Sequence, residues 1–391
     1  MKRLLEIPEY VEDVQRVAAL DLPWDKLRNK TLVITGGTGL IGSFLIDALK
    51  AADLNCHVIL LGRSEEKARQ RFLEYWTDSS ESSAVYDHQS STFLSFVRWD
   101  ANDAQLPTIT GPVDYVLHLA SNTHPVAYAT DPIGTIATNV ISLNNLLKFA
   151  SEARTTCAFY QNKDSNYNCP PPPIFSTSFS HPRFLFASSN EIYGENRGDV
   201  ELFDEKYCGY IDCNTLRAGY PESKRCGEAL CQAYIKQNGL DCVIARLTRT
   251  FGPTILPTDT KAISQFFKNA LAGEDIVLKS AGTQYYSYQY VADSVSGLLT
   301  VLLKGATREA YNIADESGDI TLRDLATLIA SQAGRKVVFD LPDAVESAGF
   351  SKATKARLLG AKLRSLGWSP ELDIGLGVRR CFHIVSSQYA D

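Results

Sequence analysis

At positions 31–42 the chain reads Thr31-Leu32-Val33-Ile34-Thr35-Gly36-Gly37-Thr38-Gly39-Leu40-Ile41-Gly42, and this stretch decides the predicted fold. Its first five residues are apolar or β-branched, which is typical of a short buried strand. Glycines follow at once, and an apolar helical pattern occupies residues 41–51. Such glycines permit a tight turn, a close approach to a pyrophosphate and packing of helix on strand, while the helix N-terminus favours phosphate. The stretch therefore predicts a dinucleotide-binding loop rather than a plain glycine-rich turn.

Strand and helix patterns continue to alternate outward from this loop. Further strands are expected at 58–61, 93–97, 115–119, 183–187 and 242–247, and helices at 64–75, 133–150 and 223–236. Alternation of this kind indicates a parallel sheet covered by helices on both faces. We therefore predict an α/β fold with a Rossmann-type doubly wound parallel sheet over residues 30–247. Residues 76–92 and 155–182, which are rich in Ser, Asp, Asn or Pro, are interpreted as a loop and a surface insertion.

The two ends of the chain do not follow the alternation. Residues 1–29 are predicted to form an N-terminal helical extension. Residues 248–391 are predicted to be mainly a smaller C-terminal α/β substrate lobe, with some segments returning to the Rossmann domain. Helices are expected near 261–271, 292–303 and 322–333. Ligands of doubly wound sheets bind at the carboxyl ends of the strands, so this lobe is expected to cover that crevice.

Bulk composition narrows the class of protein. The chain has 391 residues, 45% of them hydrophobic, and a net charge of −6. No basic stripe is apparent, which argues against a nucleic-acid partner. The nine cysteines include no CxxC pair and are interpreted as reduced thiols, and we expect no metal site. Neither a secretory leader nor an apolar run of membrane-spanning length is apparent, so we expect a cytoplasmic protein with no membrane partner.

Two later motifs have the residues of an acid–base centre. Tyr220-Pro221-Glu222-Ser223-Lys224 places a tyrosine and a lysine on one helical face at i and i+4. A cation in that place stabilises a phenolate, so the tyrosine can exchange protons near neutral pH; a surface ion–dipole pair is the alternative. Ser188-Ser189-Asn190-Glu191-Ile192-Tyr193-Gly194 follows the strand expected at 183–187, and its serines could also simply end that strand.

These motifs, in this order, resemble the short-chain dehydrogenase/reductase family. The TGGTGLIG form resembles the extended branch, the NAD-dependent epimerases and dehydratases that modify nucleotide sugars. The resemblance covers most of the chain, apart from the first 28 residues and the insertion at 155–182. It implies an NAD(P)-dependent enzyme with a retained cofactor. Such an enzyme oxidises a nucleotide sugar transiently at carbon 4 and then eliminates, decarboxylates or epimerises.

The resemblance implies a set of cofactor contacts at the carboxyl ends of the strands. The residues are Gly36, Thr38, Gly39, Leu40, Ile41, Gly42, Arg63, Asp100, Ala101, Leu119, Ala120, Ser121, Asn139, Tyr220 and Lys224. The family often has an acidic residue for the ribose of NAD where this chain has Arg63. Arg63 could accommodate the 2′-phosphate of NADP, stack on adenine or face solvent, so the cofactor is left as NAD or NADP. His118 is interpreted as a packed strand end rather than a base.

By the same resemblance the catalytic residues are Ser189, Tyr220 and Lys224, with Glu191 and Asn190 beside them. Glu191 stands where sugar 4,6-dehydratases and glucuronate decarboxylases carry Glu. It could remove the proton on carbon 5 or merely bind a loop amide. Asn190 cannot protonate a leaving hydroxyl, as the acid of the dTDP-glucose type does. Other dehydratases and decarboxylases of the family have Ser there, so Asn190 excludes neither type, and Glu191 favours a 4,6-dehydratase or a UDP-glucuronate decarboxylase.

Three residues are expected to contact the nucleotide-sugar substrate: Thr123, Arg249 and Tyr286. The family usually has Asn in place of Arg249, and Arg in place of Tyr286, where the arginine grips the diphosphate. One hypothesis is that Arg249 supplies the missing cation from across the cleft while Tyr286 stacks on a base or ribose. The other hypothesis is a different class of substrate. Tyr286 could also simply belong to an aromatic strand in the core.

Two other functions stay open at this point. One is an NAD(P)H-dependent reductase or dehydrogenase acting on a different phosphorylated or nucleotide-linked sugar or polyol. The other is a non-catalytic dinucleotide-binding protein, against which the intact Ser189, Tyr220 and Lys224 argue. The family commonly dimerises through the two long helices expected at 133–150 and 223–236. A homodimer is therefore predicted, although burial within one chain would give the same apolar pattern.

Overall fold

The computed structural model describes residues 2–76, 92–103, 105–123, 128, 130–153, 155, 181–340 and 355–389. The loop predicted at 76–92 and the insertion predicted at 155–182 lie almost wholly outside the described residues.

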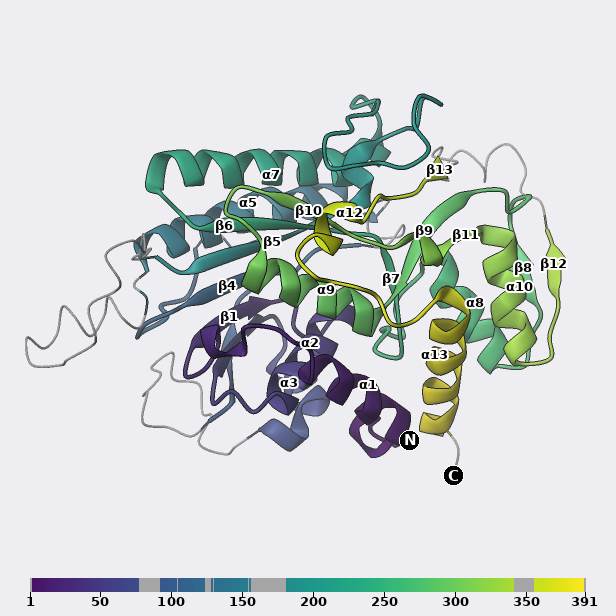
Figure 1. Ribbon diagram of the computed structural model, residues 1–391, viewed down its shortest axis with the longest axis horizontal. Coiled ribbons are helices and arrows are strands. Elements are labelled where there is room, and N and C mark those ends of the chain that lie inside the picture. The colour runs from purple at the N-terminus through teal and green to yellow at the C-terminus, as the bar shows by residue number, and fades with distance from the viewer. Residues whose placement is uncertain are drawn as a thin grey trace, which may run out of the picture.

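A seven-stranded sheet forms the centre of the molecule (Figure 1). Its spatial order is β10-β6-β5-β4-β1-β2-β3, and every neighbouring pair is parallel. The strands are β1 (Thr31–Thr35), β2 (His57–Gly62), β3 (Leu94–Arg98), β4 (Tyr115–His118), β5 (Arg183–Ser189), β6 (Cys242–Leu247) and β10 (Ala310–Ile313). The order reverses between β1 and β4, which creates the switch point where ligands bind. The predicted doubly wound Rossmann fold is thus confirmed.

Two helical layers cover the sheet because alternate strand residues point to opposite faces. On β1, Val33 joins a core with α5 (Pro132–Glu152) and α7 (Gly219–Asn238), whereas Leu32 and Ile34 join a core with α2 (Leu40–Ala51) and α9 (Val291–Lys304). Figure 1 shows α5 and α7 on one side of the sheet and α2 and α9 on the other. Among the described residues, no helix has the length and apolar character of a membrane span.

The helix predicted at 64–75 is shorter in the structure. α3 (Glu65–Arg71) ends at Phe72, and a 3-10 turn, η3 (Leu73–Tyr75), follows. Phe72 is fully buried in the core, and the Tyr75 hydroxyl donates to Asp47 of α2 at 3.0 Å. The break therefore lets both aromatic side chains turn inward.

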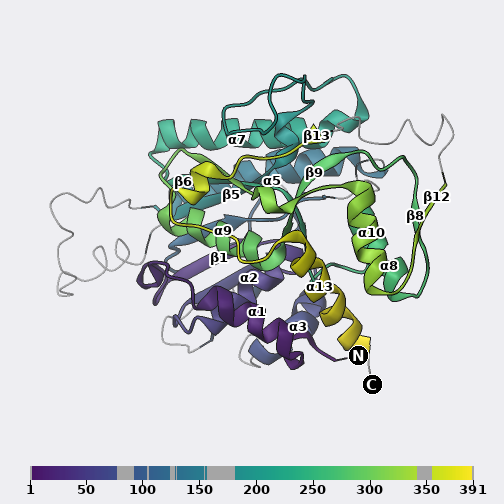
Figure 2. The same ribbon diagram turned by 45° about the vertical axis from the view of Figure 1, so that its right-hand side comes forward.

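The N-terminal extension folds against both parts of the chain. It contains η1 (Leu4–Glu6), α1 (Pro8–Ala18) and η2 (Trp24–Lys26). α1 contacts α2, α9 and the last helix, α13 (Ile374–Tyr389). Figures 1 and 2 both show α1 beside α13, with the two labelled chain ends close together. Lys2 N donates to Gln388 O at 2.9 Å.

The C-terminal part builds a smaller lobe beside the sheet (Figure 2). Its strands are β7 (Arg249–Phe251), β8 (Ile276–Leu278), β9 (Tyr285–Tyr290), β11 (Asp319–Thr321), β12 (Val337–Phe339) and β13 (Lys355–Ala356). β9 pairs with β7, β11 and β13, while β8 pairs with β12. The helices α8 (Ala262–Leu271) and α10 (Leu322–Gln332) pack on these strands. β10 and α9 lie outside this lobe, at the central sheet.

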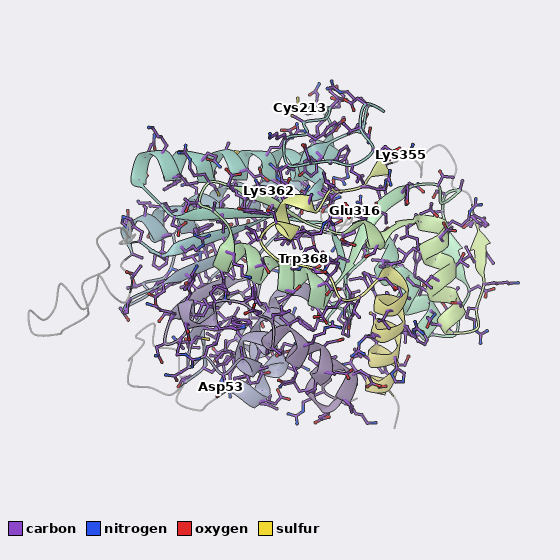
Figure 3. All side chains as sticks on the ribbon, viewed as in Figure 1. Asp53, Cys213, Glu316, Lys355, Lys362 and Trp368 are labelled. Carbon is purple, nitrogen blue, oxygen red and sulfur yellow. The ribbon has the colours of Figure 1, made fainter. Side chains whose placement is uncertain are left out.

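The segment after β13 returns across the central sheet through α12 (Ala361–Arg364). Trp368 Nε1 donates to Ser296 Oγ of α9 at 2.8 Å, and Arg364 pairs with Glu316 of η7 (Glu316–Gly318). In Figure 3 the labelled Lys362 and Trp368 belong to this segment, and the labelled Glu316 lies beside it. The labelled Cys213 belongs to a separate loop, 194–215, above the start of α7.

Candidate active site

The glycine loop has the geometry that a close dinucleotide contact requires. Gly36 has a φ of 72°, and a Cβ there would lie 2.7 Å from Ala120 N. A Cβ on Gly42 would lie 2.4 Å from Gly36 O, so helix α2 can approach the loop only with glycine at this position. Gly39 caps α2, whose first amides, including those of Leu40 and Ile41, have no acceptor within the helix. These residues, with Thr38 between them, fit a pyrophosphate.

The segment after β4 joins the glycine loop to helix α7. His118 is fully buried and its Nδ1 lies 2.8 Å from Thr35 Oγ1. Burial lowers the pKa of His118 to about 3, which fits the packed strand end that was expected. The segment 119–121 follows, and Ser121 Oγ donates to Asn139 Oδ1 at 2.7 Å. Asn139 Nδ2 in turn donates to Ser223 Oγ at 2.9 Å, one turn along from Tyr220.

Ser189 and Tyr220 meet at the carboxyl end of β5. Ser189 caps the 3-10 turn η5 (Asn190–Tyr193) and accepts from Glu191 N at 3.2 Å. Burial raises the pKa of Tyr220 to about 12, and hydrogen bonds with Ser189 and Ser121 oppose this rise. From the sequence, Lys224 was expected to stabilise the Tyr220 phenolate and so to lower its pKa. In the structure, the serine hydroxyls and Arg217 oppose the rise instead.

Lys224 lies beneath Tyr220 in a buried position. Its Nζ donates to Ala187 O at 2.8 Å and lies 5.9 Å from the centroid of the Tyr220 ring. Burial lowers the pKa of this ammonium group to about 7. A lysine with that pKa can both donate and accept a proton near neutral pH.

Two residues that the sequence analysis did not single out complete this cluster. Arg217, in the 3-10 turn η6 (Leu216–Ala218), donates from Nη2 to Glu191 Oε2 at 2.6 Å. Its guanidinium lies 5.0 Å from the centroid of the Tyr128 ring, which stacks on Tyr220 at 5.0 Å and 28°. Arg217 stands three residues before Tyr220, a spacing of nearly one helical turn that could have drawn attention to it.

Asn190 is buried beside the reactive groups. Its Oδ1 lies 3.4 Å from Ser189 Oγ, and the residue is 7% exposed. An amide in that place can orient the serine hydroxyl but has no acidic proton to transfer. Ser188, the preceding residue, instead donates to Glu228 Oε1 at 2.6 Å.

Arg249 and Tyr286 lie on adjacent strands rather than across a cleft, so this part of the expectation was wrong. β7 and β9 run parallel with Arg249 opposite Tyr288. The Arg249 guanidinium packs on the Tyr286 ring at 3.6 Å from its centroid. That face of Tyr286 is therefore covered by arginine rather than open to a base or ribose. Tyr286 also lies near Glu191 and Arg217, which affect its pKa, so both arginines border the same site.

The remaining predicted residues lie around the rim of the site. Arg63 is exposed directly after β2, and Gly62 pairs in register with Arg98 of β3. Asp100 and Ala101 are half-buried after β3, where Asp100 Oδ1 accepts from Asn102 N at 2.9 Å. Thr123 Oγ1 accepts from Lys261 Nζ at 3.2 Å, which links the loop after β4 to the C-terminal lobe. In the described part of the chain, no group of His, Cys, Asp and Glu side chains could hold a metal ion.

A comparison with protein families gives one match that spans most of the chain. The sequence model of the NAD dependent epimerase/dehydratase family matches residues 32–314. This range runs from β1 through β10, and it contains the glycine loop, Ser189, Tyr220 and Lys224.

Curated relatives are similar over nearly the whole chain. UDP-glucuronic acid decarboxylase 1 of Danio rerio is 29% identical over 362 residues, covering 92% of this chain and 73% of that protein. UDP-glucuronic acid decarboxylase 6 of Arabidopsis thaliana is 28% identical, covering 90% of this chain and 87% of that protein.

Solved structures share the fold. The dTDP-glucose 4,6-dehydratase of Bacillus anthracis, in complex with NAD, has a TM-score of 0.66 at 18% identity and covers 92% of this chain and 97% of its own. A UDP-glucuronic acid 4-epimerase mutant of Bacillus cereus, in complex with NAD and a fluorinated UDP-glucuronic acid, has a TM-score of 0.69 at 18% identity. It covers 92% of this chain and 100% of its own.

Proposed function

This chain belongs to the NAD-dependent epimerase/dehydratase family, and from that premise we propose that it decarboxylates a nucleotide-linked uronic acid after oxidation at carbon 4. The observation that carries the proposal is the cluster at the carboxyl end of β5, where Ser189, Tyr220, Glu191 and Arg217 meet. The likeness to UDP-glucuronic acid decarboxylases over 92% of the chain supports the same substrate class.

The nicotinamide dinucleotide of the family fits the residues of this chain. The loop from Gly36 to Gly42 would hold the pyrophosphate, because a side chain at Gly36 or Gly42 would collide with backbone and close the tight turn to the ligand. Asp100 and Ala101 would border the adenine, and the segment 119–121 with Asn139 would border the nicotinamide ribose. When bound, the nicotinamide supplies the acceptor, and later the donor, of the hydride at carbon 4.

Tyr220 performs the proton transfer in this proposal. In its deprotonated phenolate form Tyr220 accepts the proton of the carbon 4 hydroxyl, while Ser189 donates a hydrogen bond to the same oxygen. Lys224, with a pKa of about 7, relays the proton beneath the tyrosine. The hydrogen bonds that oppose the rise in the pKa of Tyr220 make this exchange easier at neutral pH.

Loss of carbon dioxide follows from the ketone at carbon 4. The bond from carbon 5 to the carboxylate breaks, and its electron pair moves onto the carbon 4 oxygen as an enolate. Tyr220 and Ser189 stabilise that negative charge by hydrogen bonds. A proton then adds to carbon 5 and the ketone is reduced again, so one proton is consumed and one carbon dioxide is released.

Arg249 supplies the cation for the substrate diphosphate in this proposal. It stacks on Tyr286, which stands where the family usually has the diphosphate arginine. Buried Arg249 Nη1 has no hydrogen-bond partner among the described residues, so it retains a donor for a phosphate oxygen. Thr123, held by Lys261, borders the sugar in the same proposal.

Arg63 also leaves room for NADP. No carboxylate stands between Gly62 and Ser64, and the exposed Arg63 follows β2 directly, where the adenosine ribose binds in this fold. We expect Arg63→Glu to lower the affinity for NADP by about tenfold while the affinity for NAD changes by less than about twofold. Titration of both cofactors by calorimetry measures this, with Lys67→Glu on the next helix as control. Equal losses of affinity for both cofactors would show that Arg63 does not contact the 2′-phosphate.

A homodimer through α5 and α7 belongs to the same proposal. Ile133, Ile136 and Ile141 of α5 are 81%, 44% and 51% exposed. Leu216, before α7, is 74% exposed. Single exposed apolar residues are common, but a group along one helix is typical of an interface.

The test of the function is mass spectrometry of products after incubation with UDP-glucuronic acid, UDP-glucose and dTDP-glucose. We expect a UDP-pentose and carbon dioxide from UDP-glucuronic acid alone, without net consumption of cofactor. Tyr220→Phe should reduce this turnover by a factor of about 10² to 10⁴. Loss of water from either glucose nucleotide would instead indicate a dehydratase with Glu191 as base. Stoichiometric use of added reduced cofactor would indicate a reductase.

A further inference from the structure

Arg217 is fixed beside the reactive tyrosine from two sides. Glu191 Oε2 accepts from its Nη2 at 2.6 Å, and the Tyr128 ring faces its guanidinium at 5.0 Å. Tyr128 also stacks on Tyr220, so these three side chains form one continuous layer. Arg217 thus has little freedom to turn toward solvent, although its side chain is 34% exposed.

The second terminal nitrogen of Arg217 is the atom without a role. Nη1 is buried and has no hydrogen-bond partner within the described part of the protein. Buried donors in folded proteins are nearly always paired, and an unpaired guanidinium nitrogen is costly. A positively charged N–H donor of this kind is matched by an anionic oxygen.

The position of Arg217 distinguishes between the two anionic groups of a nucleotide uronic acid. The carbon 4 oxygen must lie at Tyr220 and Ser189 for the oxidation to occur. Carbon 5, which carries the carboxylate, is bonded directly to carbon 4. Carbon 1, which carries the diphosphate, lies at the opposite end of the sugar ring. A donor beside Tyr220 is therefore in reach of the carboxylate, and Arg249 on β7 remains for the diphosphate.

The chemistry of decarboxylation does not require Glu191 to act as a base. Decarboxylation uses the electron pair of the bond from carbon 5 to the carboxyl carbon. No proton leaves carbon 5 in that step, so no base is required there. The contact that Glu191 does make is the short ion pair with Arg217.

We propose that Arg217 is the specificity-determining residue that binds the carboxylate on sugar carbon 5, and that Glu191 is a positioning residue which holds Arg217 in place. This inference rests on the proposed function, since it names the residue by which the same site would select a uronic acid.

The decisive experiment compares equilibrium binding of three ligands by calorimetry: UDP-glucuronic acid, UDP-glucose and UDP. The proteins are the full-length chain, Arg217→Gln, Arg217→Lys, Glu191→Gln and, as matched control, Arg197→Gln in the neighbouring loop, where the arginine is exposed. We expect Arg217→Gln to lower the affinity for UDP-glucuronic acid by at least about tenfold, while the affinities for UDP-glucose and UDP change by less than about twofold. Arg217→Lys should retain part of the preference, and Arg197→Gln all of it.

Glu191→Gln separates a positioning role from a base. A positioning role predicts a reduced preference for UDP-glucuronic acid over UDP-glucose, with carbon dioxide still released at saturating substrate. A base predicts an unchanged preference and an accumulated ketone, which would overturn the assignment of Glu191.

Other outcomes overturn the inference or the function separately. If Arg217→Gln lowered the affinity for all three ligands equally, Arg217 would bind the diphosphate or have only a structural role in the site. Thermal unfolding and cofactor binding of each variant identify a folding defect, and Arg217→Lys then tests the point in a folded protein. Failure of the full-length chain to release carbon dioxide, despite a carboxylate preference that depends on Arg217, would reject the proposed function alone.

Discussion

Lys224 shows at the scale of one residue how the fold prepares a reactive group at a cost in stability. Its ammonium group is buried, with Ala187 O as acceptor and Phe186 at 4.9 Å, and burial lowers its pKa from 10.5 to about 7. The unfolded chain therefore binds this proton more tightly than the folded chain does. Between those two pKa values stability increases with pH, and it decreases as the pH falls toward 7.

Lys224→Met should consequently give a more stable and inactive protein. We expect the free energy of unfolding at pH 7 to rise by about 2 to 4 kcal/mol, because the desolvation of a charged lysine is removed. The advantage over the unmodified chain should shrink as the pH rises toward about 9. Urea unfolding across this range measures it, with Lys236→Met, an exposed lysine on the same helix, as control. An advantage independent of pH would show that burial of charge is not its source.

Individual site residues were predictable from the sequence when a local spacing defines them. Tyr220 and Lys224 share a helix, and Ser189 ends a strand that its apolar pattern reveals. Arg217 and Tyr128 have no such local pattern. Their role depends on two turns, η5 and η6, that meet only when the chain has folded. The same reason explains why the stacking of Arg249 on Tyr286 was not foreseen.

At the scale of secondary-structure elements, one buried carboxylate joins the first three α-helices. Asp47 of α2 accepts from Tyr10 of α1 and from Arg71 of α3, both at 2.5 Å, and from Tyr75 at 3.0 Å. The Asp47 side chain is 0% exposed. The N-terminal extension is thus attached to the helix that begins at the cofactor loop.

Asp47→Asn should weaken this attachment severely. The substitution leaves the Arg71 guanidinium without its partner in a largely buried place, which costs about 3 to 5 kcal/mol for buried pairs. Chemical unfolding should show the loss, and hydrogen exchange should show faster exchange in α1. Asp25→Asn, in the same extension but 93% exposed, should change stability by less than about 0.5 kcal/mol. Similar losses of stability in the two variants would contradict the role of Asp47 in attaching the N-terminal extension.

The elements themselves were predicted best where tertiary context mattered least. Strands β1 and β6 have the predicted bounds, because continuous apolar runs are buried on both faces. The predicted helix at 64–75 was too long, because burial of Phe72 outweighs helical continuity there. The short strands β7 and β13 pair with β9 over three residues and two residues. Such segments have too few residues to show the alternation of apolar side chains by which a strand is recognised.

At the scale of the whole molecule, the long helix α5 leaves part of its apolar surface exposed. Leu143, Leu147 and Ala150 are fully buried against the sheet, as expected, whereas Ile133 and Ile136 are exposed. Helical spacings of three, four and seven residues relate these positions, so the exposed isoleucines continue the same face toward the start of the helix. Since the sheet covers only the first group, we expect a second copy of the chain to cover the other.

Light scattering after size exclusion tests this expectation. The unmodified chain should have the mass of a dimer, and Ile136→Asp should have the mass of a monomer at the same concentration, because a carboxylate would be buried in the interface. Val277→Asp, at a 39% exposed valine on β8, should remain dimeric. A monomeric mass for the unmodified chain would leave the exposed isoleucines without this explanation.

The contact between Arg249 and Tyr286 also has a consequence for substitutions at these two positions. In the proposed function, Arg249 on β7 supplies the cation that the family usually has at the position of Tyr286 on the neighbouring strand β9. Such an arrangement makes the two positions epistatic. Asn at 249 alone removes the only cation of the pair, and Arg at 286 alone sets two guanidinium groups against each other. Only the double exchange, Arg249→Asn with Tyr286→Arg, should restore substrate affinity, so neither position tolerates exchange without the other.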